Sequence, residues 1–279
     1  AVHNGLAMNR LYWKALSRNT TSPFELIVVD NHSTDGTEEF FRDLSLSEKG
    51  NTVIYLRNER NQSYPVSQNQ GMRSARADIL CFLNNDIWMP EGWNEPFERA
   101  LEGNLLLVMS PSGQEAQPRQ CLSDKLKRRW KYIRILSTVW RWLLMKSEED
   151  RLWKSLEWMY GNSPLRSPTP QGHQKSMPGL KGDVVVFHRE LTKKVPVIWD
   201  ERTQAADWNL YLTMAVLSEK DPAVPLPQIL LDVYVHHFGR YSARQKFEPL
   251  ERGGPLLEIE TLWDRKTIER LWWGNLLPK

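Results

Sequence analysis

The sequence is poor in cysteine and lacks both a long apolar run and a glycine-rich phosphate loop. Two of its 279 residues are cysteines, Cys81 and Cys121, which is too few for a disulfide framework. Cys81 stands within a short apolar run, where a reduced thiol packs as a small hydrophobe, so we expect a reducing, cytoplasmic compartment. No apolar run reaches the length of about 18 residues that spans a bilayer.

The absence of glycine-rich loops narrows the ways in which the protein can hold phosphate. Neither G-x-G-x-x-G nor G-K-[ST] follows any predicted strand. Such loops present backbone N–H groups to the phosphates of a bound nucleotide. Any phosphate must therefore be held by a metal ion or by side chains, and this directs attention to carboxylates at strand ends.

Apolar runs alternate with amphipathic segments through the first part of the chain. We predict strands at 24–30, 52–56, 79–83 and 105–109, and helices at 6–17, from 37 onward and at 66–75. This alternation predicts an α/β fold with a mostly parallel central sheet, helices on both faces and a Rossmann-like nucleotide-binding half. We also expect strands at 183–188 and 229–235, and helices at 208–217 and 256–271.

Polar side chains follow three of these predicted strands. The three clusters are Asp30 with the turn 31–37, Asn84-Asn85-Asp86, and His236-His237. The carboxyl ends of parallel strands meet at one edge of a sheet, where ligands bind in open α/β folds. Asp86 can hold a hard divalent cation there, and such a cation can hold a diphosphate. A plain turn after the strand is the alternative, because Asn and Asp are common turn residues.

Two longer motifs include the polar clusters after the first and third predicted strands. They are F-E-L-I-V-V-D-N-H-S-T-D-G-T at 24–37 and N-Q-G-M-R-S-A-R-A-D-I-L-C-F-L-N-N-D at 69–86. Together they resemble the motifs of the inverting glycosyltransferases of family 2, which have the GT-A fold. Residues 179–191 are similar to that family's acceptor-side strand, and W-D-E-R at 199–202 with A-D-W-N-L at 206–210 is similar to its D-E-R and E-D-x-D-L pair. The resemblance covers about residues 1–120 and 177–240.

The resemblance implies a hexosyltransferase-type enzyme of polysaccharide or cell-envelope biosynthesis. It would move a sugar from a nucleotide-diphospho sugar to a glycan or lipid-linked acceptor, with inversion and with Mg²⁺ or Mn²⁺. It would bind no nucleic acid. Four regions follow along the chain: a nucleotide-sugar-binding half at 1–118, a helical insertion with a mobile loop at 119–176, an acceptor-binding catalytic half at 177–247 and a helical tail at 248–279.

The resemblance also assigns residue roles. The donor residues it implies are Val2, His3, Asn4, Asp30, Asn31, Ser33, Asn69, Asn84 and Asn85; the metal ligands are Asp86 with His236 or His237; and the general base is Asp207. Asp30 would read the nucleotide base, with capping of the following turn as its alternative. Asp207 has helix N-capping as its alternative, and the histidine pair has a surface position. We prefer His236 as the ligand because it ends the strand directly.

The sequence departs from the family pattern at several positions. Asn84 replaces the first acid of the metal motif, and Ala206 and Asn209 replace two acids around Asp207. Residues 1–4 match only the end of the first strand, so we expect a chain truncated within that strand. These departures keep open a catalytically impaired binding or scaffold protein. A nucleotidyltransferase is a weaker rival, because it would need a basic, glycine-rich loop.

The insertion is basic and rich in tryptophan. Its charged residues Lys125, Lys127, Arg128, Arg129, Lys131 and Arg134 are interspersed with Trp130, Tyr132, Ile133 and Leu136. This composition fits a helix in peripheral contact with an anionic membrane surface, on the cytoplasmic face. It equally fits a helix packed on the core, with Lys and Arg stems covering apolar surface. Residues 162–178 predict a mobile loop, because they are rich in Pro, Ser and Gly.

Overall fold

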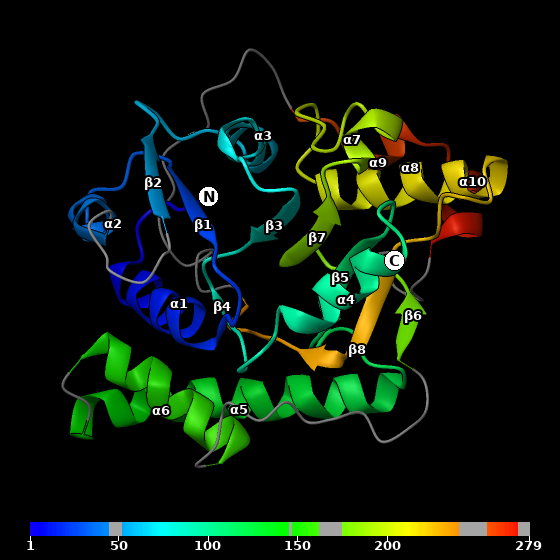
Figure 1. Ribbon diagram of the computed structural model, residues 1–279. Helices are drawn as coiled ribbons and strands as arrows, with labels where there is room; N and C mark the ends of the chain where they lie inside the picture. The colour runs from blue at the N-terminus through cyan, green and yellow to red at the C-terminus, as the bar shows by residue number, and fades with distance from the viewer. Residues whose placement is uncertain (45–51, 145–146, 162–174, 240–255, 273–279) are drawn as a thin grey trace.

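The computed structural model describes residues 1–44, 52–144, 147–161, 175–239 and 256–272. Its strands form three sheets (Figure 1). The largest has the order β3-β7-β5-β8-β6, and the pairs β1-β2 and β4-β9 stand apart from it. The strands are β1 Glu25–Asp30, β2 Thr52–Arg57, β3 Ile79–Leu83, β4 Ile87–Trp88, β5 Val108–Ser112, β6 Ser176–Pro178, β7 Val184–His188, β8 Gln228–Tyr234 and β9 His236–His237.

The large sheet is mixed rather than mostly parallel. β5 and β8 run parallel, whereas β7 runs antiparallel to both β3 and β5. The regular alternation of strand and helix, which is the signal for a parallel sheet, stops after β5. A long insertion separates β5 from β7, and the chain re-enters the sheet in the opposite direction.

Helices cover both faces of this sheet (Figure 1). They are α1 Leu6–Asn19, α2 Thr37–Leu44, α3 Tyr64–Ser74, α4 Glu95–Gly103, α5 Gln120–Leu144, α6 Glu148–Tyr160, α7 Leu191–Lys194, α8 Ala206–Lys220, α9 Ile259–Leu262 and α10 Arg265–Leu271. None of the helices in the described ranges is long and apolar enough to cross a membrane. The predicted terminal helix is two short ones, because Asp264 caps α10 by accepting a hydrogen bond from the backbone N–H of Thr267.

β7 shows why the sheet is buried on both faces. Val184 and Val186 belong to an apolar cluster shared with α1, α4, α5 and α6, while Val185 and Phe187 belong to a second cluster shared with α8, α9 and α10. Alternate side chains of one strand thus enter opposite cores. The strand's continuous apolar run follows from this arrangement.

The basic insertion forms α5 and α6, which lie together along the lower edge of Figure 1. Trp130 and Ile133 of α5 are buried in the cluster shared with α1 and α6. The packing role predicted for this segment is therefore confirmed for the inner face of α5. Of the predicted mobile loop, residues 162–174 lie outside the described residues, and Ser176–Pro178 form β6, which pairs with β8.

β1 and β3 face each other without pairing among the described residues. A cavity of about 710 Å³ lies between them, lined by β1 residues such as Leu26 and by all of β3. Cys81 is exposed in this cavity, so the expectation that it is buried is wrong. At one end, Val2 forms a parallel bridge with Asp30. The β1-β2 pair thus contacts the large sheet through helices and loops rather than through a strand ladder.

Candidate active site

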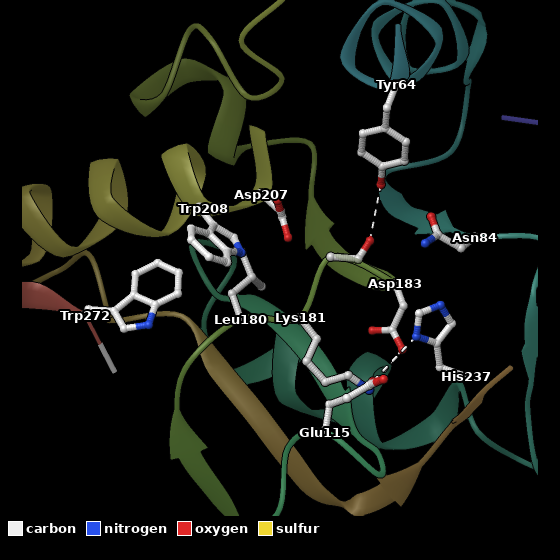
Figure 2. A pocket seen from close by; sticks show the side chains of 11 residues that line it. Tyr64, Asn84, Glu115, Leu180, Lys181, Asp183, Asp207, Trp208, His237 and Trp272 are labelled. Carbon is white, nitrogen blue, oxygen red and sulfur yellow. Dashed lines mark hydrogen bonds and ion pairs between the residues drawn. The ribbon is translucent and has the colours of Figure 1, made fainter. Parts of the chain in front are cut away.

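The end of β3 and the start of β7 meet at a cavity of about 430 Å³ (Figure 2). Because the two strands are antiparallel with Leu83 opposite Val184, the end of one adjoins the start of the other. The backbone N–H of Asn84 donates to the carbonyl of Asp183 over 2.9 Å. The cavity is lined by residues from seven stretches of the chain, among them Asn84, Asp183 and Asp207. Tyr64 of α3 also lines it, and its hydroxyl donates to the Gly182 carbonyl over 3.2 Å.

Glu115, Asp183 and His237 line one side of this cavity, and the buried Asp86 contacts His237. We call these four residues the carboxylate–histidine cluster. The His237 ring lies between two acids, with Nε2 3.3 Å from Asp86 Oδ1 and Nδ1 3.5 Å from Glu115 Oε2. One potential ligand atom from each of Glu115, Asp183 and His237 lies within 4.8 Å of the others. Oxygen and imidazole donors of this kind suit Mn²⁺ and, with more oxygens, Mg²⁺.

Electrostatics hold this cluster together. Burial alone would lower the pKa of His237, but its hydrogen bonds to Asp86 and Glu115 raise that pKa well above the usual value. Burial opposes ionisation of Glu115 too, yet the hydrogen bond from His237 and the charge of Lys181 lower its pKa to about 2. The imidazole thus acts as a cation between two carboxylates, a place that a divalent ion can take.

His236 points away from the cluster. Its Nδ1 lies 2.6 Å from the Tyr160 hydroxyl, and its ring packs edge-on against Trp130 with centroids 4.3 Å apart. Burial lowers its pKa to about 3. The pairing of β9 with β4 sets these directions, since Ile87 lies opposite His237. This geometry favours His237 as the ligand, against the preference for His236.

Lys181 brings a positive charge to the same place. Its Nζ lies 2.9 Å from Asp183 Oδ2, and both side chains are buried. Gly113 leaves room for this contact, because a Cβ there would lie 2.3 Å from the Lys181 Nζ. Breaking a buried pair of this kind leaves a charge uncompensated and typically costs about 3–5 kcal/mol. One of the carboxylates near the metal position is therefore already paired.

Asp207 lies in the first turn of α8, where Ala205 is the N-cap residue. The N-capping alternative for Asp207 therefore does not apply. Burial raises the pKa of Asp207 to about 6, helped by the charge of Asp183 and opposed by the backbone N–H of Trp208. Gly182 allows the carboxylate its position, because a Cβ there would lie 2.2 Å from the Asp207 Oδ2.

The residues predicted to hold the nucleotide base come together beside β1. The backbone of Val2 bonds to both sides of Asp30, and His3 Nδ1 lies 2.6 Å from the Asn31 carbonyl. Asp30 accepts hydrogen bonds from the Ser33 backbone N–H and hydroxyl at 2.9 and 2.5 Å, and from the Tyr55 hydroxyl. The Asn4 backbone N–H donates to the Ser33 Oγ over 2.7 Å.

Two further predicted donor residues have structural partners. The Asn85 side chain donates to Asn9 of α1 over 2.7 Å. Asn69 donates to the Trp199 carbonyl and to Glu201 at 2.9 and 2.8 Å, which ties α3 to the loop before α8. Both contacts hold the frame around the cavity. Asn69 does not line the cavity, whereas Asn84 does.

Five residues that line the cavity were not predicted from the sequence as site residues: Tyr64, Glu115, Lys181, Asp183 and Trp272. Asp183 had a usable signal, since it precedes an apolar strand in the same way that Asn84 follows one, but only an antiparallel β7 brings it to this edge. Glu115 lies in an irregular loop after β5, and Trp272 arrives from the end of the chain. Their positions depend on tertiary contacts that no local pattern encodes.

The family model described as "Glycosyl transferase family 2" matches residues 2–159, more than half of the chain. An uncharacterized glycosyltransferase, YfnE, of Bacillus subtilis (strain 168) is 39% identical over 85 residues, which are 28% of this chain and 20% of that protein. Glycosyltransferase AglE of Haloferax volcanii is 36% identical over 74 residues, which are 26% of this chain and 24% of that protein. The matched part thus spans about a quarter or less of these relatives.

Solved structures show the same fold. Mannosyltransferase PcManGT from Pyrobaculum calidifontis, in complex with GDP-Man and Mn²⁺, aligns with a TM-score of 0.52 at 15% identity, over 85% of this chain and 54% of that one. GalNAc-T7 with UDP, GalNAc and Mn²⁺ aligns with a TM-score of 0.50 at 14% identity, over 88% of this chain and 42% of that one. The predicted GT-A fold is confirmed.

Proposed function

Because the chain belongs to glycosyl transferase family 2, we propose that it transfers a sugar from a nucleotide-diphospho sugar to an acceptor hydroxyl. One observation carries this proposal: Asp207, a carboxylate with a raised pKa, lines the same cavity as Glu115, Asp183 and His237. A base on one side and a cation-binding cluster on the other are the two parts that the reaction needs.

Asp207 would act as the general base. With its pKa raised to about 6, the carboxylate is mostly ionised at neutral pH and is a stronger base than an ordinary aspartate. Its Oδ atoms would accept the proton of the acceptor hydroxyl as that oxygen attacks the anomeric carbon and the nucleoside diphosphate departs. A single displacement of this kind inverts the anomeric centre, and one base suffices, unlike the paired carboxylates of glycosidases.

Mg²⁺ or Mn²⁺ would bind at the carboxylate–histidine cluster, held by Asp86, Glu115, Asp183 and His237. A cation bound there would neutralise charge on the leaving diphosphate. The cluster fits such an ion because Glu115, Asp183 and His237 bring two carboxylates and an imidazole within 4.8 Å of one another, and Asp86 lies at the other nitrogen of the same imidazole. Mn²⁺ in two structural neighbours supports this assignment.

We propose that the nucleotide lies beside β1, with Asp30 at its base and Val2, His3, Asn4, Asn31 and Ser33 around it. GDP-Man and UDP in the neighbours support a nucleotide sugar as donor. Asn84 and Asn85 would lie near the diphosphate, and Asn69 would act through the frame that it ties together.

The acceptor would lie against the two indoles on the other side of Asp207. The Trp208 and Trp272 rings have centroids 4.5 Å apart and line the cavity opposite the carboxylate–histidine cluster (Figure 2). Flat aromatic faces suit the apolar face of a sugar ring or an isoprenoid chain. We therefore propose a glycan or lipid-linked acceptor and a cytoplasmic reaction, in keeping with two free, exposed cysteines.

A non-catalytic binding protein is the second candidate, and the Lys181–Asp183 pair favours it. The ammonium group neutralises one carboxylate of the cluster, and Asn84 supplies no charge. If this pair replaces the metal, a nucleotide sugar would bind equally well with and without Mn²⁺, and no transfer would follow.

Thermal unfolding separates the two candidates. The melting temperature is measured with UDP-, GDP- and dTDP-sugars, with and without Mn²⁺, for the wild type and Asp86→Ala. Asp232→Asn is the matched control, because Asp232 is an exposed acid on β8. We expect one donor to raise the melting temperature of the wild type and control in a Mn²⁺-dependent way, and to do so weakly or not at all in Asp86→Ala. No Mn²⁺-dependent rise with any of these donors would overturn the proposal.

A further inference from the structure

The outer face of α5 carries large apolar side chains that no described part of the chain covers. Tyr132, Ile135, Leu136, Val139 and Trp140 are between 41% and 67% exposed. Their spacing of three and four residues places them in one stripe along the helix, opposite the buried Trp130 and Ile133. Isolated exposed apolar residues are common, but a continuous stripe marks an interaction surface.

Positive charge adjoins this stripe on the same helix. Lys125, Arg128, Arg129 and Lys131 are exposed within the two turns that precede Tyr132. α5 contains seven Lys or Arg residues and a single acid, Asp124. The exposed face is therefore cationic in its first half and apolar in its second. A protein partner would need to match both halves, whereas an anionic bilayer offers phosphate headgroups and acyl chains side by side along its whole surface.

We propose that the outer face of α5 is a docking surface for an anionic lipid bilayer, with the helix lying in the plane of the interface. The apolar half would enter the boundary between headgroups and acyl chains, and the basic half would contact the headgroups. At about 1.5 Å per residue, the 25 residues of α5 span about 37 Å, which makes a long contact for a chain of this size.

The same helix supports the candidate active site from its inner face. The Trp130 Nε1 donates to the Phe238 carbonyl over 3.2 Å, and Arg134 donates to the Gly239 carbonyl over 3.2 Å. Phe238 directly follows His237, so one helix separates the docking surface from the carboxylate–histidine cluster. This placement would bring a lipid-linked acceptor close to the cavity; that consequence rests on the proposed function, whereas the docking itself does not.

Vesicle flotation tests the docking surface. The full chain is floated with vesicles of phosphatidylcholine alone and of phosphatidylcholine mixed with phosphatidylglycerol. We expect flotation only with the mixed vesicles and a loss of it in high salt. Arg128→Gln/Lys131→Gln should weaken partition about 30-fold, because each basic residue near an anionic surface contributes about a fivefold increase. Ile135→Ser/Val139→Ser should weaken it at least about tenfold through lost apolar burial.

Leu105→Ser/Val197→Ser is the matched control, because these apolar residues are 43% and 59% exposed but lie off α5. It should float like the wild type. No flotation of the wild type, or equal flotation of all variants, would overturn the proposal. So would a concentration-dependent dimer, seen by light scattering, that Ile135→Ser/Val139→Ser abolishes, since the stripe would then bind a second copy. Donor binding should be unchanged in every variant, so a failure here leaves the proposed reaction standing.

Discussion

The side of the molecule that we expect to hold the nucleotide and the side that carries the proposed base are built differently. Around β1, Asp30 is fully buried and accepts hydrogen bonds from Ser33 and Tyr55, so its charge is met by neighbouring donors. At α8, Asp207 is half-buried at the cavity wall near another acid, Asp183, and desolvation raises its pKa to about 6. The proposed nucleotide side is a polar network whose members already satisfy one another, whereas the proposed base lies in surroundings that oppose its ionisation.

The two sides also differ in the size of their apolar cores. The cluster under β1 and β2 is small, with Val2, Val28, Phe41 and Val53 as its buried members. The two clusters on either face of the large sheet are several times larger. A cavity of about 710 Å³ separates β1 from β3. The smaller core predicts that the β1–β2 pair opens locally more readily than the large sheet does.

The largest expected effect compares the two aspartates. Asp207→Asn should lower the rate of transfer by about 10²–10⁴-fold and leave donor affinity unchanged, because a carboxamide cannot take the acceptor's proton. Asp30→Asn should do the reverse: it weakens donor binding, since it disturbs the network with Ser33 and Tyr55, and it spares the maximal rate. Initial rates at saturating donor and calorimetric titration of the donor measure both. If Asp207→Asn transferred sugar as fast as the wild type, Asp207 would not be the base and the contrast between the two aspartates would be wrong.

A second prediction compares the stability of the two cores. Phe41 belongs to the small cluster and Phe187 to a large one, and both are fully buried. Replacing either by Ala should cost about 3–5 kcal/mol of stability. In Phe41→Ala the backbone amides of β1 and β2 should exchange faster while those of the large sheet keep their protection, because the small cluster opens locally. In Phe187→Ala it should lower protection throughout. If Phe41→Ala loosened the large sheet equally, the two sides would be one cooperative unit.

The pH dependence of the transfer rate tests whether Asp207 is the base. Because Asp207 must be ionised to act as a base, and its pKa is about 6, the rate at saturating donor should fall about tenfold between pH 7 and pH 5. Its folded pKa lies above the ordinary value of 3.8, so ionisation costs folding free energy, and this cost appears as the pH rises from about 4 to about 6. A rate profile flat down to pH 5 would remove Asp207 as the base.

Much of this fold follows from local patterns. The run 79–83 predicts β3 to the residue, and the helix predicted at 6–17 lies within α1. The two-residue strands β4 and β9 have no periodicity to detect, yet their pairing decides that His237 rather than His236 faces Asp86. Side-chain direction at the end of a strand depends on such a pairing, and alternation alone left it open.

The residues of the candidate site also fall into two groups, those that lie in sequence motifs and those that tertiary contacts bring to the site. Asp86 and Asp207 could be predicted because motifs surround them, whereas Lys181 and Asp183 reach the cavity only because β7 is antiparallel. Glu115 comes from a loop whose position depends on contacts between distant segments, such as the bond from the Gln114 side chain to the His237 carbonyl over 2.5 Å. Residues of this kind are found by structure and not by spacing.

The smallest expected effect tests the cavity between the two sides. Cys81→Leu adds apolar volume where β3 faces β1, and it should stabilise the protein by about 1 kcal/mol by covering apolar walls. Cys121→Leu, at an exposed position on α5, should leave stability unchanged. Chemical denaturation of both variants measures this. If β1 and β3 were already in close contact, the larger side chain would be overpacked and Cys81→Leu would instead lose about 1–3 kcal/mol. The sign of this one difference therefore decides whether the nucleotide side is packed independently of the catalytic side.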